Sequence, residues 1–179
     1  MLRENDFKKP PHYYHFNFEY TVFGYFKELD WLLIQKTILH FSQMYRVQIQ
    51  ALVMMDSHVH LLFRIPDQRE HFFAQEIIKK LNASEENQVE PITNLSQYLN
   101  TYKYIYRNPV EAGMVTCCED YPYSSLHGLL GRSSLRIQIN DAMGLIQNPI
   151  YVLNWLNNKD QMFKYSQPKS FNQESSDLI

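Results

Sequence analysis

Glycine and cysteine are scarce in this sequence. Five glycines occur among 179 residues, and no GxGxxG or Walker pattern is present, which argues against a glycine-rich phosphate-binding loop. The two cysteines, Cys117 and Cys118, are adjacent, and adjacent cysteines seldom pair with each other. We interpret them as partly buried thiols of a protein from a reducing compartment, in preference to half of a metal site.

Strong net charge and long apolar runs are also missing. The formal charge is −2, so overall charge does not predict nucleic-acid binding, which would require a local basic patch. No apolar run approaches the length of a membrane span, and the N-terminal M-L-R-E-N-D-F-K-K-P-P is too polar for a signal peptide. We therefore expect a cytoplasmic protein with no membrane partner.

Hydrophobic periodicity predicts an α+β fold. Aromatic residues alternate over 13–20, with Tyr14, Phe16, Phe18 and Tyr20 on one face, which is typical of a half-buried strand. Further strands are predicted over 47–55, 58–65 and, as a short edge strand, 89–92, and helices over about 30–45, 68–82 and 94–107. The pattern indicates an antiparallel sheet of three or four strands covered by helices.

Several local signals set the expected boundaries. Asp30 is a candidate N-cap of the first helix, and Asp56-Ser57 is expected to turn between two hairpin strands. Asn108-Pro109-Val110-Glu111 has the form of a capping box, which would start a new helix after the third one. We expect one main domain over 1–130, a helical extension over 131–165 that includes a helix start at Asn148-Pro149, and a disordered tail over 166–179.

Two histidines stand out in the stretch M-M-D-S-H-V-H-L-L-F-R-I. His58 and His60 are two residues apart in a predicted strand, so both side chains point to the same face and can meet one cation. Ordinary hydrogen-bonded histidines are the simpler interpretation of an isolated H-x-H pattern. A metal site would also require at least a third ligand.

The predicted helix over 94–107 offers candidates for the missing group. Its apolar stripe is predicted to be buried and includes Tyr98, Tyr102 and Tyr106, whereas Tyr104 lies on the opposite side. Asn108 is one turn beyond Tyr104, so a phenol and an amide oxygen would project together. A helix cap for Asn108 and an ordinary surface position for Tyr104 are the alternatives.

Three linked motifs resemble a known family. They are M-D-S-H-V-H-L at 55–61, Y-I-Y-R-N-P-V-E-A-G-M-V at 104–115 and Y-P-Y-S-S at 121–125. Their order and spacing are similar to those of single-strand tyrosine transposases of the HUH type, in particular the REP-associated branch. The resemblance spans about residues 12–130.

The resemblance implies a ferredoxin-like fold and a specific chemistry. Such proteins bind single-stranded or hairpin DNA and cleave one strand as endonuclease and strand transferase, leaving a 5′-phosphotyrosine. Carried across, Tyr104 is the nucleophile, and His58, His60 and Asn108 hold a divalent metal, Mg²⁺ or Mn²⁺. Lys103 and Arg107 flank Tyr104 and are candidate phosphate contacts, or else solvated helix charges. Monomer and homodimer both remain open.

Two other functions compete with this one. The acidic stretch S-E-E-N-Q-V-E-P-I at 84–92 and the slightly negative charge would weaken a DNA grip, which favours a non-catalytic descendant that binds DNA hairpins. A ferredoxin-like RNA-binding module, with the aromatic strand at 13–20 as a stacking surface, is the third hypothesis.

Overall fold

The computed structural model describes residues 2–10, 12–20, 27–84, 88–158 and 163. Its elements follow one another along the chain as η1 (Glu4–Phe7), β1 (His12–Glu19), α1 (Lys27–Tyr45), β2 (Gln48–Met54), β3 (His58–Ile65), α2 (Glu70–Leu81), β4 (Gln88–Ile92), α3 (Leu95–Glu111), η2 (Cys118–Asp120), α4 (Ser125–Leu129) and α5 (Pro149–Asn157). The predicted strands and the first three predicted helices are all present.

A four-stranded antiparallel sheet forms the centre of the molecule. Its strand order is β2-β3-β1-β4, and β1 pairs with both β3 and β4. Together with the chain order β1-α1-β2-β3-α2-β4, this is the ferredoxin-like arrangement. The predicted α+β class and edge strand are confirmed, and Pro91 is tolerated in β4 because that strand lies at the sheet edge.

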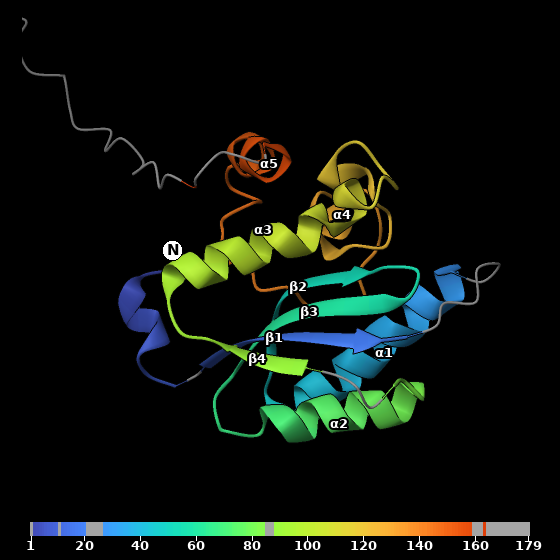
Figure 1. Ribbon diagram of the computed structural model, residues 1–179, viewed down its shortest axis with the longest axis vertical. Coiled ribbons are helices and arrows are strands. Elements are labelled where there is room, and N and C mark those ends of the chain that lie inside the picture. The colour runs from blue at the N-terminus through green and yellow to red at the C-terminus, as the bar shows by residue number, and fades with distance from the viewer. Residues whose placement is uncertain (1, 11, 21–26, 85–87, 159–162, 164–179) are drawn as a thin grey trace, which may run out of the picture.

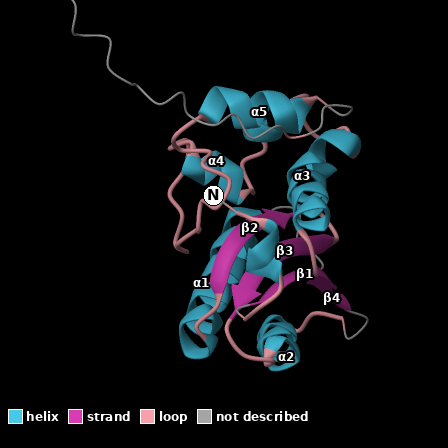
Figure 2. Ribbon diagram, turned by 90° about the vertical axis from the view of Figure 1, so that its left-hand side faces the viewer, coloured by secondary structure: helices cyan, strands magenta, loops and turns pink. Residues whose placement is uncertain are grey.

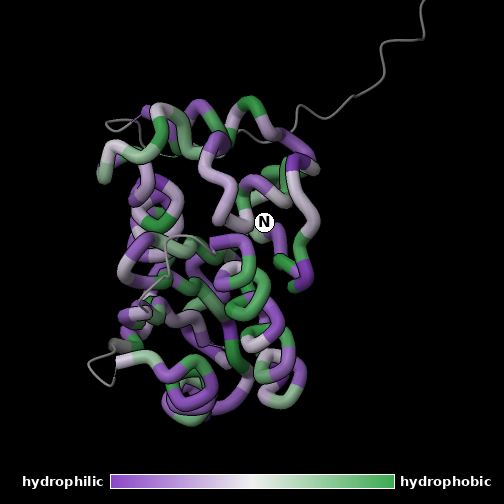
Figure 3. The backbone as a smooth tube through the Cα atoms, turned by 90° about the vertical axis from the view of Figure 1, so that its right-hand side faces the viewer, coloured by the Kyte–Doolittle hydropathy of each residue, from purple (hydrophilic) through white to green (hydrophobic). Residues whose placement is uncertain are grey.

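Helices cover both faces of the sheet. Figure 1 shows α1 and α2 on one side and α3 on the other, and Figure 2 shows α5 farther out, beyond α3 and α4. Hydrophobic stretches of the chain gather in the middle of the molecule, whereas hydrophobic and hydrophilic stretches alternate along the peripheral helices (Figure 3). The sheet is therefore buried on two faces, with a separate core on each.

The alternation along β1 places its residues as predicted. Phe16 and Phe18 are fully buried in the core shared with α1 and α2. Tyr13 points to the other face, where its ring packs against Phe7 and Tyr98. His15 lies on that same face, two residues further along the strand.

The predicted cap at Asp30 is wrong. Asp30 lies inside α1, one turn after Lys27, and its carboxylate accepts a hydrogen bond from the Tyr20 hydroxyl at 2.8 Å. The side chain is buried and serves a tertiary contact. The carboxylate that was predicted to cap the helix N-terminus instead accepts a hydrogen bond from Tyr20, which lies outside the helix.

The predicted capping box at Asn108 is also wrong. α3 continues through Pro109 to Glu111, and Glu111 forms an ion pair with Arg107 of the same helix at 2.7 Å. A proline near the end of a helix removes a single hydrogen bond, and burial of the Pro109 ring favours the continuous helix. The side chain of Asn108 is thereby free of a capping role. The helix begins as predicted, with Asn94 accepting from the backbone N–H of Gln97 at 2.8 Å.

The C-terminal part contacts both sides of the sheet, with α5 on the α3 side and Ile137 in the core under α1 and α2. α5 begins with Asn148 and Pro149 as predicted, and Trp155 on α5 stacks on Tyr102 of α3 with ring centroids 6.3 Å apart. Ile139 also forms a parallel bridge with Ile49 of β2. The tail expected over 166–179 lies outside the described residues.

Candidate active site

Two neighbouring strands bring three histidines together on the α3 side of the sheet. His58 and His60 share one face of β3, with ring centroids 4.7 Å apart and planes at 82°. In β1, Asn17 is the register partner of His60, and His15 lies diagonally across from it. The predicted proximity of His58 and His60 is confirmed, and His60 is only 1% exposed.

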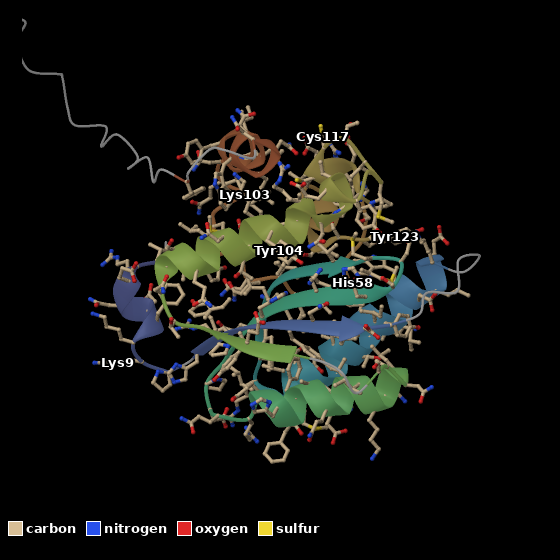
Figure 4. The ribbon with its side chains drawn as sticks, viewed as in Figure 1. Lys9, His58, Lys103, Tyr104, Cys117 and Tyr123 are labelled. Atoms are coloured by element: carbon tan, nitrogen blue, oxygen red, sulfur yellow. The ribbon has the colours of Figure 1, made fainter. Side chains whose placement is uncertain are left out.

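Tyr104 is the exposed tyrosine of α3. Tyr98, Tyr102 and Tyr106 are at most 2% exposed, as the predicted stripe requires, whereas Tyr104 is 53% exposed. Its ring lies edge-on to His60, with centroids 5.3 Å apart, and to His15 at 6.2 Å. The helix thus places one phenol at the opening above the histidines, and Figure 4 shows Tyr104 between α3 and the strands that carry them.

His15 is a site residue that sequence reasoning missed. Its Nε2 lies 3.2 Å from Nδ1 of His60, and the two rings stack at 21° with centroids 5.3 Å apart. On its other side, Nδ1 lies 3.8 Å from a carboxylate oxygen of Glu90 in β4. The signal was present in the alternation of residues 13–20, which assigns His15 to the face opposite the aromatic one. The alternation does not, however, indicate that β1 pairs with β3, the strand that carries His60.

Burial favours the uncharged form of all three imidazoles. Loss of solvent, and then the neighbouring His15 and His58, lower the pKa of His60 to about 3. Burial also lowers the pKa of His15, against the opposing effect of Glu90, and that of His58, against the opposing effect of Glu19. Neutral imidazoles retain a lone pair on one nitrogen each, which is the form that binds metals.

Two buried ring nitrogens lack a hydrogen-bond partner among the described residues, one on His127 and one on His60 of this cluster. Nε2 of His60 is buried without a partner among the described residues, and a buried polar atom left this way is energetically costly. His58 is only partly buried, and its Nδ1 lies 3.0 Å from the Ser57 hydroxyl; if Nδ1 donates to that oxygen, the lone pair of the ring is on Nε2. A cation bound by these two nitrogens would satisfy His60, so the residues fit a metal.

Asn108 supplies the third candidate ligand. Its amide nitrogen donates to the Tyr104 carbonyl at 3.3 Å, one helical turn back, which leaves the side-chain oxygen as an acceptor. No group of three or more His, Cys, Asp or Glu side chains suited to a metal occurs within the described part of the chain. A site built on His58 and His60 would take its further ligands from other groups, such as the amide oxygen of Asn108, water or a phosphate of the substrate.

A polar cavity of about 410 Å³ opens beside Tyr104. It is lined by His15, Asn17, Glu90, Asn100, Thr101 and Tyr104. These side chains come from β1, β4 and α3, so the cavity lies at the open edge between the sheet and the helix. It gives a polar ligand access to the exposed phenol.

Lys103 and Arg107 are directed away from this cavity. Lys103 Nζ donates to the Asn158 carbonyl at 2.6 Å and lies 5.4 Å from the centre of the Trp155 ring. Arg107 donates to the carbonyls of Leu156 and Asn157 at the end of α5. Figure 4 shows Lys103 on the α5 side of α3, opposite Tyr104. In this arrangement both cations tie α5 to α3, a contact that local sequence patterns do not indicate.

Two further expectations concern the rest of the chain. Cys117 and Cys118 are free thiols, and burial raises the pKa of Cys118 to about 12, so that thiol stays protonated at neutral pH. None of the helices in the described ranges is both long enough and apolar enough to cross a membrane.

Comparison with known proteins identifies the fold. No protein-family model matches the sequence. No curated protein matches it either. A similar solved structure is that of a REP-associated tyrosine transposase bound to a REP hairpin, with a TM-score of 0.60 and 19% identity over 74% of this chain and 88% of that one. This agrees with the resemblance drawn from the three motifs, and the chain shares the fold of that transposase.

Proposed function

We propose that the protein is a metal-dependent endonuclease and strand transferase for single-stranded or hairpin DNA, with Tyr104 as the nucleophile. The observation that carries this proposal is the exposed phenol of Tyr104 beside His60, whose buried Nε2 has no partner in the described structure. An accessible nucleophile beside the imidazole of His60, with His58 on the same face of β3 and Asn108 one helical turn away, is suited to phosphoryl transfer. The fold shared with a hairpin-bound transposase supports the choice of substrate.

The reaction would proceed by attack of the Tyr104 oxygen on a DNA phosphorus. The phenol loses its proton to solvent, a new bond forms from its oxygen to phosphorus, and the bond from phosphorus to the 3′ oxygen breaks. That oxygen takes up a proton and leaves as a 3′-hydroxyl, while the 5′ phosphate stays on the tyrosine. One phosphate ester replaces another, so a 3′-hydroxyl can reverse the step and rejoin strands.

His58 and His60, through their Nε2 atoms, and Asn108, through its side-chain oxygen, would hold Mg²⁺ or Mn²⁺. Such an ion, when bound, supplies Lewis-acid polarisation of the scissile phosphate. The residues of the chain do the rest: β3 fixes the two imidazoles on one face, and α3 presents Tyr104 and Asn108 one turn apart. Burial of His60 keeps its lone pair unprotonated.

The structure does not support an RNA-binding module in which bases stack on the aromatic strand at 13–20. Tyr14, Phe16 and Phe18 face the core under α1 and α2 and are at most 8% exposed. Bases cannot stack on rings that are already covered by protein. The aromatic strand is therefore explained by packing.

Covalent adduct formation tests the proposal. Purified protein is incubated with Mn²⁺ and labelled single-stranded hairpin DNAs and separated on a denaturing gel. We expect a metal-dependent protein–DNA adduct that disappears in Tyr104→Phe and persists in Tyr151→Phe, a control on α5 outside the cavity. Hairpin binding without any adduct would contradict catalysis and identify a non-cleaving DNA-binding descendant.

A further inference from the structure

We propose that His15 is a positioning residue for His60, acting as the hydrogen-bond acceptor that fixes which nitrogen of His60 faces the metal site. The inference rests on the proposed metal site and adds a residue that the three sequence motifs do not contain. It assigns His15 an outer role, in which it contacts His60 and not the cation.

The contact between the two rings is built by the sheet. β1 and β3 pair in register, with His15 opposite Leu62 and Asn17 opposite His60, so the imidazoles lie diagonally on one face. Nε2 of His15 and Nδ1 of His60 are 3.2 Å apart, and both rings are largely buried. A contact held by two paired strands restricts the orientation of both rings.

The hydrogen bond determines the tautomer of His60. A neutral imidazole carries one proton, so one nitrogen donates and the other accepts. If Nδ1 of His60 donates to His15, its Nε2 must be the unprotonated atom, and that is the buried nitrogen with no partner among the described residues. The opposite tautomer would bury an N–H without an acceptor, which is costly.

Glu90 sets the direction of this bond. Its carboxylate lies 3.8 Å from Nδ1 of His15, and the two residues are register partners across β1 and β4. A negative charge there favours the proton on Nδ1 of His15 and leaves Nε2 as the acceptor for His60. Nε2 of His15 then accepts from His60, and the proton on Nδ1 is directed at Glu90, so neither nitrogen offers a lone pair to a cation. Outer partners of this kind orient metal-ligating histidines.

Paired substitutions at His15 test the role through metal affinity. His15→Gln places an amide oxygen near the position of Nε2 and keeps an acceptor, whereas His15→Phe keeps a ring and removes it. By calorimetric titration of metal-free protein with Mn²⁺, we expect about 10–100-fold weaker binding in His15→Phe and near wild-type binding in His15→Gln. Equal affinity in His15→Phe and wild type, or no Mn²⁺ binding by wild type, would overturn the inference.

The tautomer itself provides a test that needs no variant. Long-range ¹H–¹⁵N NMR of metal-free wild-type protein distinguishes protonated from unprotonated ring nitrogens. We expect the proton of His60 on Nδ1 and that of His15 also on Nδ1; a proton on Nε2 of His60 would refute the assignment. Neither measurement involves DNA, so an absent DNA adduct with these results intact would overturn only the proposed function.

Discussion

The two faces of the sheet are covered by different kinds of side chain. On the α1–α2 face, rings such as Phe16, Phe63 and Phe73 are fully buried against one another and against aliphatic residues. On the α3 face, the buried rings are mainly tyrosines, and their hydroxyls reach partners, as in Tyr106 with the Ser125 hydroxyl at 2.8 Å. His60 is on this second face. Its Nε2 is buried without a partner in the described structure.

This difference indicates that the α1–α2 face mainly stabilises the fold, whereas the α3 face carries the candidate site. A mainly apolar face gains most of its stabilising free energy from burial and has few polar groups to satisfy, such as the Tyr20 hydroxyl and the Asp30 carboxylate. A face with buried polar groups must satisfy each of them, and a group left unsatisfied there calls for an explanation. A metal-ligating role for Nε2 of His60 supplies one. The comparison therefore predicts large losses of stability for substitutions in the apolar core and a small one at His60, where metal binding is affected instead.

The largest effect is expected for Phe63→Ala. Phe63 is fully buried between Phe73 and Tyr14, with ring centroids 5.0 and 5.7 Å away. Its truncation leaves a cavity and should lower the free energy of unfolding by about 3–5 kcal/mol, measured by urea denaturation. Phe72→Ala on the exposed side of α2 is the control and should change it by less than about 0.5 kcal/mol. Similar losses in both variants would contradict the assignment of this face to stability.

A medium effect is expected where the apolar face contains a polar pair. The buried Tyr20 hydroxyl donates to Asp30 at 2.8 Å, so Tyr20→Phe should lower the free energy of unfolding by about 1.5–3 kcal/mol at pH 7. Burial, and then the hydrogen bond and charge of Asp30, raise the pKa of Tyr20 to about 12.

The same pair predicts a pH dependence. Between pH 10 and 12 the unfolded chain loses the Tyr20 proton while the folded chain keeps it, so this stabilisation is lost as pH rises. The gap between wild type and Tyr20→Phe should shrink over that window, with Tyr45→Phe as the control ring. A gap that widens would show that the sign is wrong.

The smallest stability effect is expected for His60→Leu. Removing the unpartnered Nε2 offsets the lost contact with His15, so without metal the free energy of unfolding should change by less than about 1 kcal/mol. Mn²⁺ at about 100 times its dissociation constant should stabilise wild type by about 2.7 kcal/mol and leave His60→Leu unchanged. Thermal denaturation with and without Mn²⁺ measures both. Equal stabilisation of the variant would exclude His60 as a ligand.

Much of the fold could be predicted from the sequence because it depends on periodicity. The alternation around Phe16 and Phe18 and the helical stripe through Tyr98 and Tyr102 identify elements and their buried faces. Helix boundaries that depend on tertiary contacts could not be predicted in this way. Asp30 accepts a bond from Tyr20 rather than capping its helix, a choice that depends on the way β1 ends beside α1.

The site divides in the same way. His58, His60, Tyr104 and Asn108 are linked by local spacing within one strand and one helix, so they could be identified as candidates. The positions of His15, Lys103 and Arg107 depend on which element lies alongside. The pairing of β1 with β3 places His15 beside His60. Lys103 and Arg107, which were candidate phosphate contacts, instead donate hydrogen bonds to backbone carbonyls at the end of α5.

The most direct measurement is identification of the residue that becomes attached to DNA. The protein is incubated with Mn²⁺ and a hairpin oligonucleotide, digested with nuclease and protease, and analysed by mass spectrometry. We expect a nucleotide-modified peptide with the phosphate on Tyr104, formed only with metal. Attachment at another tyrosine, or no attachment while the hairpin and Mn²⁺ both bind, would contradict Tyr104 as the nucleophile.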